Sequence, residues 1–381
     1  MKALVLNAEQ KTATVKNIPE PRLAPNEVCV RVEFVALNPV DSLNMFNPLG
    51  STGRVLCSDF AGCIYRIGDE VPNNAGITIG DRVAGFVQGA CSINERPGAA
   101  ADYVVCPWDL VWRIGSGRRL QEAAAVSLCA LSAAQALFFR MGLPSPFPWS
   151  ESAGEEASSS QLSVFIYGAT TSVALYAAQL ARKSAECSGR QLKLLGTASQ
   201  KHFGMLKANP YSYDEIIDYR GQKWPEEILK LTDGKGVDYA YDCISEGSTV
   251  SNTARTLSSN GSMAIVRSRE GGAWTASDLA FEPSHGAVWE GLGENVEYQG
   301  MTLPASQDAR DFTVAFYKWL SMGNQLETSP VREMPGGLES MNDDGLTLLG
   351  SGAMTERNVK SEKTWMKPLS AQKMVYAIPN S

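Results

Sequence analysis

The pattern of hydrophobic and polar positions divides this chain of 381 residues into two kinds of region. Residues 1–115 hold short segments in which apolar and polar side chains alternate, as in Val28–Val35, with glycine-rich turns between them. An alternation with a period of two is typical of strands that bury one face. Short strands at regular spacing predict a small β-barrel in this part of the chain.

From Ser163 onward, apolar runs alternate with amphipathic segments. The pattern predicts helices at 173–182 and 225–231, and strands at 163–167, 193–197, 213–219, 237–244 and 262–266. The run at 295–300 is predicted to be the last strand of the same sheet. Because strands and helices alternate, we expect an α/β fold with a Rossmann-type, doubly wound parallel sheet.

The remaining segments connect and close this arrangement. An alanine- and leucine-rich stretch predicts a helix over 121–141, and a proline- and serine-rich stretch predicts an exposed loop over 142–161. Within that loop, Phe147-Pro148-Trp149 either packs against its own domain or docks a partner. A helix at 309–322, a polar loop at 350–368 and a closing strand at 374–378 complete the pattern.

Composition and charge narrow the function classes. A formal net charge of -7 disfavours a nucleic-acid surface, which needs a basic stripe, and disfavours binding to anionic lipid. No apolar run reaches the length of a membrane helix, and the first residues are typical of a strand, not of a signal peptide. The eight cysteines contain no Cys-x-x-Cys pair, and only two histidines are present. We therefore expect reduced thiols, a cytoplasmic location and no histidine-rich metal site.

The segment after the strand at 163–167 is typical of a dinucleotide-binding turn. Gly168 precedes three hydroxyl residues, Thr170, Thr171 and Ser172, and the predicted helix follows at Val173. A glycine allows the strand to turn, and free N–H groups at a helix N-terminus bind phosphate. The usual later glycines of this fingerprint are missing. The same hydroxyls alternatively serve only as helix caps.

The end of the next strand indicates which dinucleotide would bind. A carboxylate at this place grips the ribose 2′-hydroxyl of NAD, but here the residues are Ser199, Gln200, Lys201 and His202. A hydroxyl, a cation and a histidine without an acid favour the 2′-phosphate of NADP(H). The alternative is an ordinary polar loop with one exposed lysine.

Several motifs in a fixed order carry a resemblance to a known superfamily. They are Ala-Leu-Asn-Pro-Val-Asp at 36–41, Cys-Ser-Asp-Phe-Ala-Gly at 57–62, Gly-Asp-Arg-Val at 80–83, Gly-Ala-Ala-Ala-Asp-Tyr-Val at 98–104 and Ser-Ala-Ala-Gln-Ala-Leu at 132–137. The chain resembles the medium-chain dehydrogenases/reductases nearly end to end. It is most similar to the trans-acting enoyl reductases of fungal polyketide synthases, on three features: the zinc-free segment at 38–41, the Ser/Thr-rich turn, and the patterns at 218–220 and 242–244.

The resemblance implies a division into domains and a reaction. The expected domains are a GroES-like catalytic domain over 1–125, a Rossmann cofactor-binding domain over 126–305, and a C-terminal part over 306–381 that returns to the catalytic domain. The implied activity is hydride transfer from NADPH to the β-carbon of an α,β-unsaturated polyketide thioester in secondary metabolism. Without a metal, backbone N–H groups, a cofactor hydroxyl or a side chain must stabilise the developing oxyanion.

The resemblance also implies which residues contact the cofactor. Asp41, alternatively a turn cap, would approach the nicotinamide, and Tyr219, alternatively a half-buried strand tyrosine, would lie beside the adenosine phosphate. Together with the turn and Ser199–His202, the implied set is Asp41, Ser42, Leu43, Asn44, Gly168, Thr170, Thr171, Ser172, Val173, Ser199, Gln200, Lys201, His202, Tyr219, Val266, Arg267, Ser370 and Ala371.

The implied substrate wall consists of a helix and a later segment. Its residues are Ser127, Leu128, Cys129, Ala130, Leu131, Ser132, Ala133, Ala134, Ala287, Val288, Trp289, Glu290 and Gly291. The first eight alternatively form only a close-packed helix. Cys57 faces the cleft in relatives but is also typical of a small buried thiol, so no catalytic proton donor is assigned. Arg267 and Arg269 either hold an acidic group of the substrate carrier or form surface ion pairs.

Two other functions remain open at this point. One is a free-standing NADPH quinone or alkenal reductase, and the other is a redox-inactive binding or scaffold subunit, which the missing glycines permit. The proline- and serine-rich loop favours a trans-acting enzyme whose partner is a polyketide or hybrid synthase with a carrier-bound thioester. The chain is expected to be a monomer or dimer that contacts neither nucleic acid nor membrane.

Overall fold

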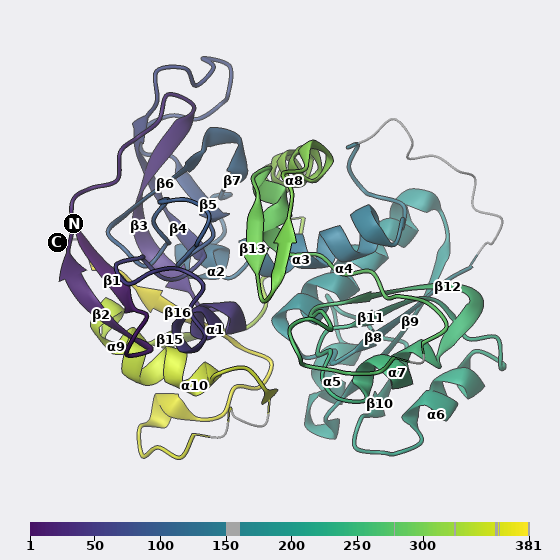
Figure 1. The fold of residues 1–381 in the computed structure, drawn as a ribbon. Coiled ribbons are helices and arrows are strands. Elements are labelled where there is room, and N and C mark those ends of the chain that lie inside the picture. Colours follow the sequence, from purple (N-terminus) through teal and green to yellow (C-terminus); the bar gives the residue numbers. More distant parts are fainter. Residues whose placement is uncertain (150–160, 278, 324, 355–356, 358, 380–381) are drawn as a thin grey trace. The chain divides into compact units, whose positions relative to one another are not determined.

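The computed structural model describes residues 1–149, 161–277, 279–323, 325–354, 357 and 359–379. The chain divides into two compact units (Figure 1). The first unit consists of Met1–Leu128 and Trp289–Ser381, and the second of Cys129–Val288. Residues 289–305, expected in the cofactor-binding domain, pack in the first unit.

The first unit is built on a seven-stranded sheet with the strand order β15-β16-β3-β4-β5-β7, in which β6 also pairs with β3. Its strands are β3 (Glu27–Ala36), β4 (Asp59–Ile67), β5 (Arg82–Phe86), β6 (Tyr103–Pro107), β7 (Val111–Arg113), β15 (Val331–Met334) and β16 (Lys373–Ala377). All the pairs are antiparallel except β15 with β16. The strands predicted at 28–35 and 374–378 therefore form, with shifted ends.

The first unit also contains smaller elements. Two hairpins pair β1 (Lys2–Asn7) with β2 (Thr12–Asn17), and β13 (Val296–Tyr298) with β14 (Met301–Leu303). The helices are α1 (Pro39–Phe46), α2 (Leu120–Ala124), α8 (Gln307–Leu320), α9 (Gly337–Ser340) and α10 (Thr347–Leu349), with a π-helical stretch over Met341–Leu346 and short 3₁₀ turns over Trp108–Leu110, Val288–Leu292 and Thr364–Met366. One apolar core joins buried side chains of β3, β4 and β16 with those of the C-terminal helices.

The prediction of a last parallel strand at 295–300 was wrong. These residues form β13 and the turn of the β13–β14 hairpin, outside the parallel sheet. Gln299 and Gly300, with φ of 45° and 82°, make a two-residue turn that reverses the chain at once. Such a turn directs the next residues into antiparallel pairing, so the run cannot reach the parallel sheet.

The second unit is a parallel sheet with the strand order β10-β9-β8-β11-β12. Its strands are β8 (Gln161–Tyr167), β9 (Gln191–Ala198), β10 (Glu215–Asp218), β11 (Val237–Asp242) and β12 (Leu257–Ile265). The helices are α4 (Ser172–Ser188), α5 (Phe203–Lys207), α6 (Trp224–Leu231) and α7 (Thr249–Ala254), and Gln200–His202 form a 3₁₀ turn. From β8, the chain first adds β9 and β10 on one side and then returns to add β11 and β12 on the other side. The order of the strands therefore reverses between β8 and β11, as in a Rossmann sheet.

The predicted helix over 121–141 is three segments in the structure. They are α2, α3 (Ser127–Ala134) and a π-helical turn over Gln135–Arg140, and the helix is interrupted at Ala125 and Val126. Phe147 packs edge-on against Phe138, and Trp149 packs on Phe139, so these two aromatic residues pack against their own domain as one alternative predicted. Residues 150–160 of the predicted loop lie outside the described part of the chain.

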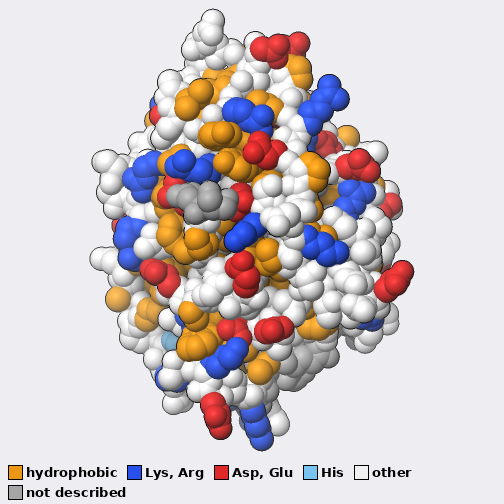
Figure 2. All heavy atoms as spheres, turned by 90° about the vertical axis from the view of Figure 1, so that its left-hand side faces the viewer, with side chains coloured by type: hydrophobic (Ala, Val, Ile, Leu, Met, Phe, Trp, Pro, Cys, Tyr) orange, Lys and Arg blue, Asp and Glu red, His pale blue; other side chains and the backbone are white. Residues whose placement is uncertain are grey.

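Two further observations concern the surface. On the face shown in Figure 2, basic and acidic side chains are interspersed with hydrophobic ones. In the part of the chain that the structure describes, no helix combines the length and the apolar character that crossing a membrane requires.

Candidate cofactor site

The carboxyl edge of the parallel sheet gathers the predicted cofactor residues of the second unit. The register pairs the last residues of β10 and β9, those of β8 and β11, and those of β11 and β12. The residues that follow each strand therefore form one row: Tyr219, Ser199, Gly168, Cys243 and Val266. In open α/β sheets, ligands bind at the carboxyl ends of the strands where the strand order reverses, which here is Gly168 and Cys243.

Gly168 is required by the turn between β8 and α4. Its φ is 73°, a conformation that residues with a Cβ adopt at a cost. A Cβ at this position would also lie 2.7 Å from Cγ1 of Ile244. The N–H of Gly168 donates to the Thr197 hydroxyl at 3.1 Å, which ties the turn to β9. One glycine is thus sufficient to turn the strand, although the later glycines of the fingerprint are missing.

The N-terminus of α4 retains free hydrogen-bond donors. The Thr171 hydroxyl accepts from the N–H of Ala174 at 3.2 Å, so this side chain caps the helix, as the alternative reading predicted. Within the described residues, the N–H groups of Ser172 and Val173 have no acceptor, and both residues are half-buried. Because a helix N-terminus with free N–H groups attracts anions, this donor set fits a pyrophosphate.

The end of β9 carries positive charge without a carboxylate. Lys201 is exposed and forms no ion pair with any described residue. Burial and the neighbouring Lys201 lower the pKa of His202 below its usual value. At the end of the next strand, Asp218 accepts from the N–H of Arg220 at 3.0 Å and lies 3.4 Å from its Nη1. The carboxylate at the end of β10 is therefore already paired with a cation.

Tyr219 lies just beyond β10 and is 41% exposed, so it is not the half-buried strand tyrosine of the alternative reading. The guanidinium of Arg220 lies 4.9 Å from its ring centroid. The parallel register places Tyr219 next to Ser199 in the row. An exposed tyrosine and the exposed cation of Lys201 thus lie at the end where an adenosine phosphate would lie, with Arg220 already bound to Asp218 and to the Tyr219 ring.

Asp242 fixes the loop at the other end of the row. Its buried carboxylate accepts from the N–H groups of Ile244 and Ser245 at 2.9 and 2.8 Å, and from the Thr249 hydroxyl at 2.6 Å. Burial raises the pKa of Asp242 to about 6. The Ser245 hydroxyl in turn accepts from the N–H of Val266 at 3.1 Å, which joins this loop to the end of β12.

Arg267, the residue after Val266, is engaged within its own unit. Its Nη1 lies 2.8 Å from Oε1 of Glu246, and both side chains are largely buried. Arg269 pairs with Glu282 at 2.9 Å and lies over the Trp274 ring. Both arginines therefore form ion pairs, and only that of Arg269 lies at the surface as the alternative predicted.

A buried ionic cluster organises the first unit. Lys373 donates from Nζ to Oδ2 of Asp59, and the two side chains are 3% and 0% exposed. Asp59 also accepts from Nδ2 of Asn38 at 3.0 Å and from the N–H of Leu128 at 2.8 Å. One carboxylate thereby connects the beginnings of α1, α3 and β16. Sequence reasoning missed Asp59 and Lys373, although a lysine at the start of an apolar closing strand was a visible signal.

Asp41 caps α1 from inside the same cluster. Its Oδ2 accepts from the N–H of Asn38 at 2.7 Å and its Oδ1 from the Ser58 hydroxyl at 3.2 Å. Asp41 is 1% exposed, so the turn-cap interpretation describes its contacts. Ser42 and Asn44 are also buried and bond to backbone carbonyls, whereas Leu43 is partly exposed.

Asparagine in place of Asp41 should remove a pH dependence of stability. Burial, and to a lesser degree the Asp59 charge, raise the pKa of Asp41 from 3.8 to about 7. The folded state then binds more protons than the unfolded state, so the stability that Asp41 contributes is present below about pH 4 and lost as the pH rises through about 7. Relative to Asp41→Asn, the wild-type free energy of unfolding should fall by up to about 1.4 kcal/mol per pH unit in this window. Urea denaturation of both proteins across the window measures this, and a constant difference would contradict it.

The predicted substrate wall is mostly packed core. Ser127 is fully buried and accepts from Nε1 of Trp112 at 2.9 Å. Trp289 donates to the Val87 carbonyl at 3.3 Å and packs edge-on against Tyr298. Among the thirteen predicted residues, only Ser132 and Glu290 are half-buried, and the others are buried. The close-packed-helix interpretation therefore accounts for most of the segment 127–134.

Cys57 fits the buried-thiol interpretation. It is 0% exposed, and burial raises its pKa well above the usual value, as do the charges of Asp41 and Asp59 to a smaller extent. A thiol in this environment stays protonated and unreactive.

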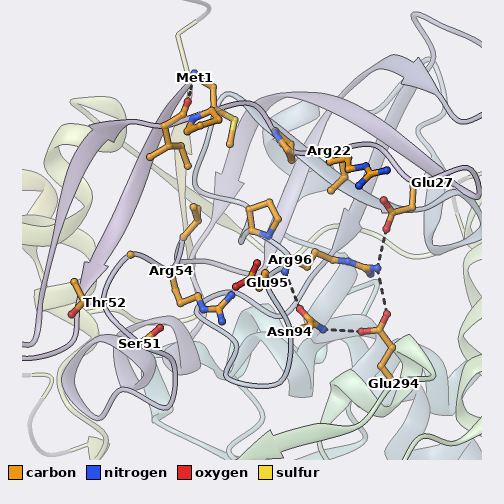
Figure 3. A pocket seen from close by; sticks show the side chains of 17 residues that line it. Met1, Arg22, Glu27, Ser51, Thr52, Arg54, Asn94, Glu95, Arg96 and Glu294 are labelled. Carbon is orange, nitrogen blue, oxygen red and sulfur yellow. Dashed lines mark hydrogen bonds and ion pairs between the residues drawn. The ribbon is translucent and has the colours of Figure 1, made fainter.

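A concavity of about 800 Å³ in the first unit contains none of the predicted site residues (Figure 3). On its wall, Arg96 bridges Glu27 at 2.8 Å and Glu294 at 3.3 Å, and Asn94 donates to Glu294 at 2.9 Å. The charges of Arg96, Glu27 and Glu294 are thus paired with one another.

Comparisons with known proteins agree with this geometry. Residues 24–116 match the alcohol dehydrogenase GroES-like domain, and residues 173–282 match the zinc-binding dehydrogenase family. The chain is 30% identical to the trans-enoyl reductase ACTTS2 of Alternaria alternata over 359 residues, which are 93% of this chain and 96% of the relative. The chain belongs to the medium-chain dehydrogenase/reductase superfamily. Within this superfamily it is a member of the trans-enoyl reductase family.

Further members of the superfamily show the same likeness. The trans-enoyl reductase FSL5 of Gibberella zeae is 27% identical over 99% of this chain and 97% of its own length. An alcohol dehydrogenase superfamily protein from Novosphingobium aromaticivorans matches the fold with a TM-score of 0.73 at 17% identity, over all of both chains. The CurK enoyl reductase matches with a TM-score of 0.69 at 16% identity, over 99% of each chain.

The zinc in the name of one matching family does not fit this chain. In the described part of the chain, no three His, Cys, Asp or Glu side chains are grouped so that they could hold a metal ion. We therefore derive no step through zinc.

Proposed function

We propose that this chain is a trans-acting enoyl reductase that uses NADPH to reduce an α,β-unsaturated polyketide thioester in secondary-metabolite biosynthesis. The observation that supports this most is made at the carboxyl edge of the parallel sheet. Beside Ser199 and Tyr219 of the row lie the cations Lys201 and Arg220, and the carboxylate of Asp218 there is not free because it is paired with Arg220. Relatives named trans-enoyl reductases, similar over nearly their whole length, support the reaction class.

The second unit would hold the cofactor in three places. The N–H groups of Ser172 and Val173 would bind the pyrophosphate, Lys201 the 2′-phosphate, and Tyr219 would lie against the adenosine. A phosphate bound by a lysine gains affinity that a ribose hydroxyl does not offer. NADPH supplies a hydride when it is bound.

The first unit would supply backbone held in place by a buried ion pair. Negative charge develops on the thioester oxygen as the β-carbon is reduced, and fixed dipoles stabilise such a charge best. Asp59 and Lys373 fix the starts of α1, α3 and β16. Of the predicted contact residues, Leu43 lies in α1, Ser132 lies in α3, and Ser370 comes shortly before β16. These buried charges would therefore hold the backbone in place.

The name of the relatives suggests the partner. Trans-acting describes an enzyme that is separate from the synthase it serves, so the substrate of this chain would arrive on the carrier of a polyketide or hybrid synthase.

A titration of the purified chain with NADPH and with NADH tests the cofactor assignment. Trp224 packs on Tyr167 with ring centroids 5.1 Å apart, and Tyr167 directly precedes the Gly168 turn, so tryptophan fluorescence reports on this site. We expect NADPH to bind at least about tenfold more tightly than NADH, which corresponds to about 1.4 kcal/mol. Equal affinities, or no binding of either dinucleotide, would contradict the proposal.

A further inference from the structure

The segment that leads into β16 is fastened to the first unit by one arginine. Arg332, on β15, donates to the backbone carbonyls of Trp365 at 3.2 Å, Lys367 and Pro368 at 3.2 Å. It also donates to Oε1 of Gln372 from Nη2 at 2.8 Å and from Nε at 3.1 Å. These hydrogen bonds lie on both sides of Ser370 and Ala371, the two residues of this segment predicted to contact the cofactor.

The geometry requires an arginine. The guanidinium is planar and carries five N–H donors in a fixed fork, whereas a lysine ammonium has three donors at one point. Arg332 forms no ion pair with a described acidic residue, and burial lowers its pKa below the usual value. Its charge is therefore satisfied by carbonyl oxygens of the segment itself. Such a set of contacts holds a loop in one conformation.

A second side chain fastens the other end of the segment. Asp344 is 2% exposed and accepts from Nε1 of Trp365 at 2.7 Å and from Nζ of Lys363 at 2.6 Å. Trp365 is thus held through its indole by Asp344 and through its carbonyl by Arg332. The path from Lys363 to Gln372 is fixed before β16 begins.

The fastened segment contains an unfavourable backbone conformation. Ala371 has a φ of 54°, in the left-handed region that favours glycine. A residue keeps such a conformation only when its surroundings enforce it, and these outliers gather at binding sites. Arg332 supplies that enforcement, because it bonds to Pro368 and Gln372 on either side.

We infer that Arg332 is a positioning residue that holds Ser370 and Ala371 in the conformation that binds the cofactor. This inference rests on the proposed function for the identity of the ligand. Arg332 itself touches no cofactor atom in this account; it acts through the backbone between Pro368 and Gln372. Without the guanidinium of Arg332, Ala371 would relax to a negative φ. The segment would then have to be ordered again each time the dinucleotide binds.

The experiment compares wild type with Arg332→Lys in NADPH titrations and in hydrogen exchange of the segment 365–372. We expect Arg332→Lys to weaken NADPH binding about tenfold and to speed amide exchange in that segment. Arg113→Lys is the matched control, because Arg113 donates from its side chain to the single carbonyl of Gly76. It should leave affinity and exchange unchanged.

A rescue separates positioning from general destabilisation. Glycine adopts a positive φ without strain, so Ala371→Gly placed in the Arg332→Lys chain should recover most of the lost affinity. If Arg332→Lys fails to fold, Gln372→Ala removes two of the hydrogen bonds and should show a smaller loss in the same direction. Unchanged affinity and exchange in these variants, while wild type binds NADPH, would overturn the inference. Failure of wild type to bind NADPH would overturn the proposed function instead. The exchange data would still show whether Arg332 holds the segment 365–372 in place.

Discussion

Replacement of Asp59 by asparagine should destabilise the first unit by about 3–5 kcal/mol, which is the usual cost of removing one partner of a buried ion pair. The variant keeps the shape of the side chain but leaves the Lys373 ammonium, 3% exposed, without its counter-charge. An asparagine accepts with one oxygen only, so it also cannot serve Asn38, Leu128 and Lys373 together. The loss should appear as a lower urea midpoint.

A double variant shows whether the lost charge is the cause. Asp59→Asn combined with Lys373→Met removes both charges, while the asparagine oxygen still accepts from Asn38 or Leu128. Replacement of a whole buried pair is often neutral, so the double variant should regain more than half of the stability lost by Asp59→Asn. If Asp59→Asn costs less than about 1 kcal/mol, the pair does not hold the starts of α1, α3 and β16 as we describe.

A large loss of NADPH affinity is expected when Lys201 is replaced. Its replacement by alanine should weaken NADPH binding about tenfold to a hundredfold, or about 1.4–2.8 kcal/mol, and leave NADH binding nearly unchanged. Lys201 is exposed and unpaired in the described part of the chain, so its ammonium is available for the 2′-phosphate that only NADPH carries. The same fluorescence titration measures both ligands, and the difference should shrink at high salt because exposed charges are screened.

Lys207→Ala is the control for this effect. Lys207 is an exposed lysine on α5, a few residues away, and it pairs with Glu215 at 3.1 Å. Its loss changes the net charge by the same amount without touching the end of β9. Equal weakening of NADPH and NADH by Lys201→Ala, or equal effects of the two lysine variants on NADPH, would mean that Lys201 does not bind the 2′-phosphate.

The sequence pattern predicts the centre of the parallel sheet well because β8, β9 and β11 each contain a compact apolar run. The runs before Gly168, before Ser199 and before Cys243 are buried on both faces, so periodicity locates them and, with them, the residues that follow. The fold therefore brings together Gly168, Ser199–His202 and Tyr219 without any signal beyond the strand ends.

Other features could not be predicted because they depend on partners far apart in the chain. Asp59 and Lys373 are separated by 314 residues, and neither lies in a motif that indicates an ion pair. The β13–β14 hairpin depends on the positive φ of Gln299, which a single sequence does not reveal. Ser127 and Trp289 look like contact residues until their hydrogen-bond partners, Trp112 and the Val87 carbonyl, are known.

The most direct test of the central claim is to follow the hydride itself. The purified chain is mixed with NADPH deuterated at the transferable position and with a crotonyl thioester of N-acetylcysteamine, and the product is analysed by NMR. We expect one deuterium at the β-carbon of a saturated thioester and a much slower reaction with deuterated NADH. Oxidation of NADPH only by a quinone, or binding of NADPH without any transfer, would contradict the assignment as an enoyl reductase.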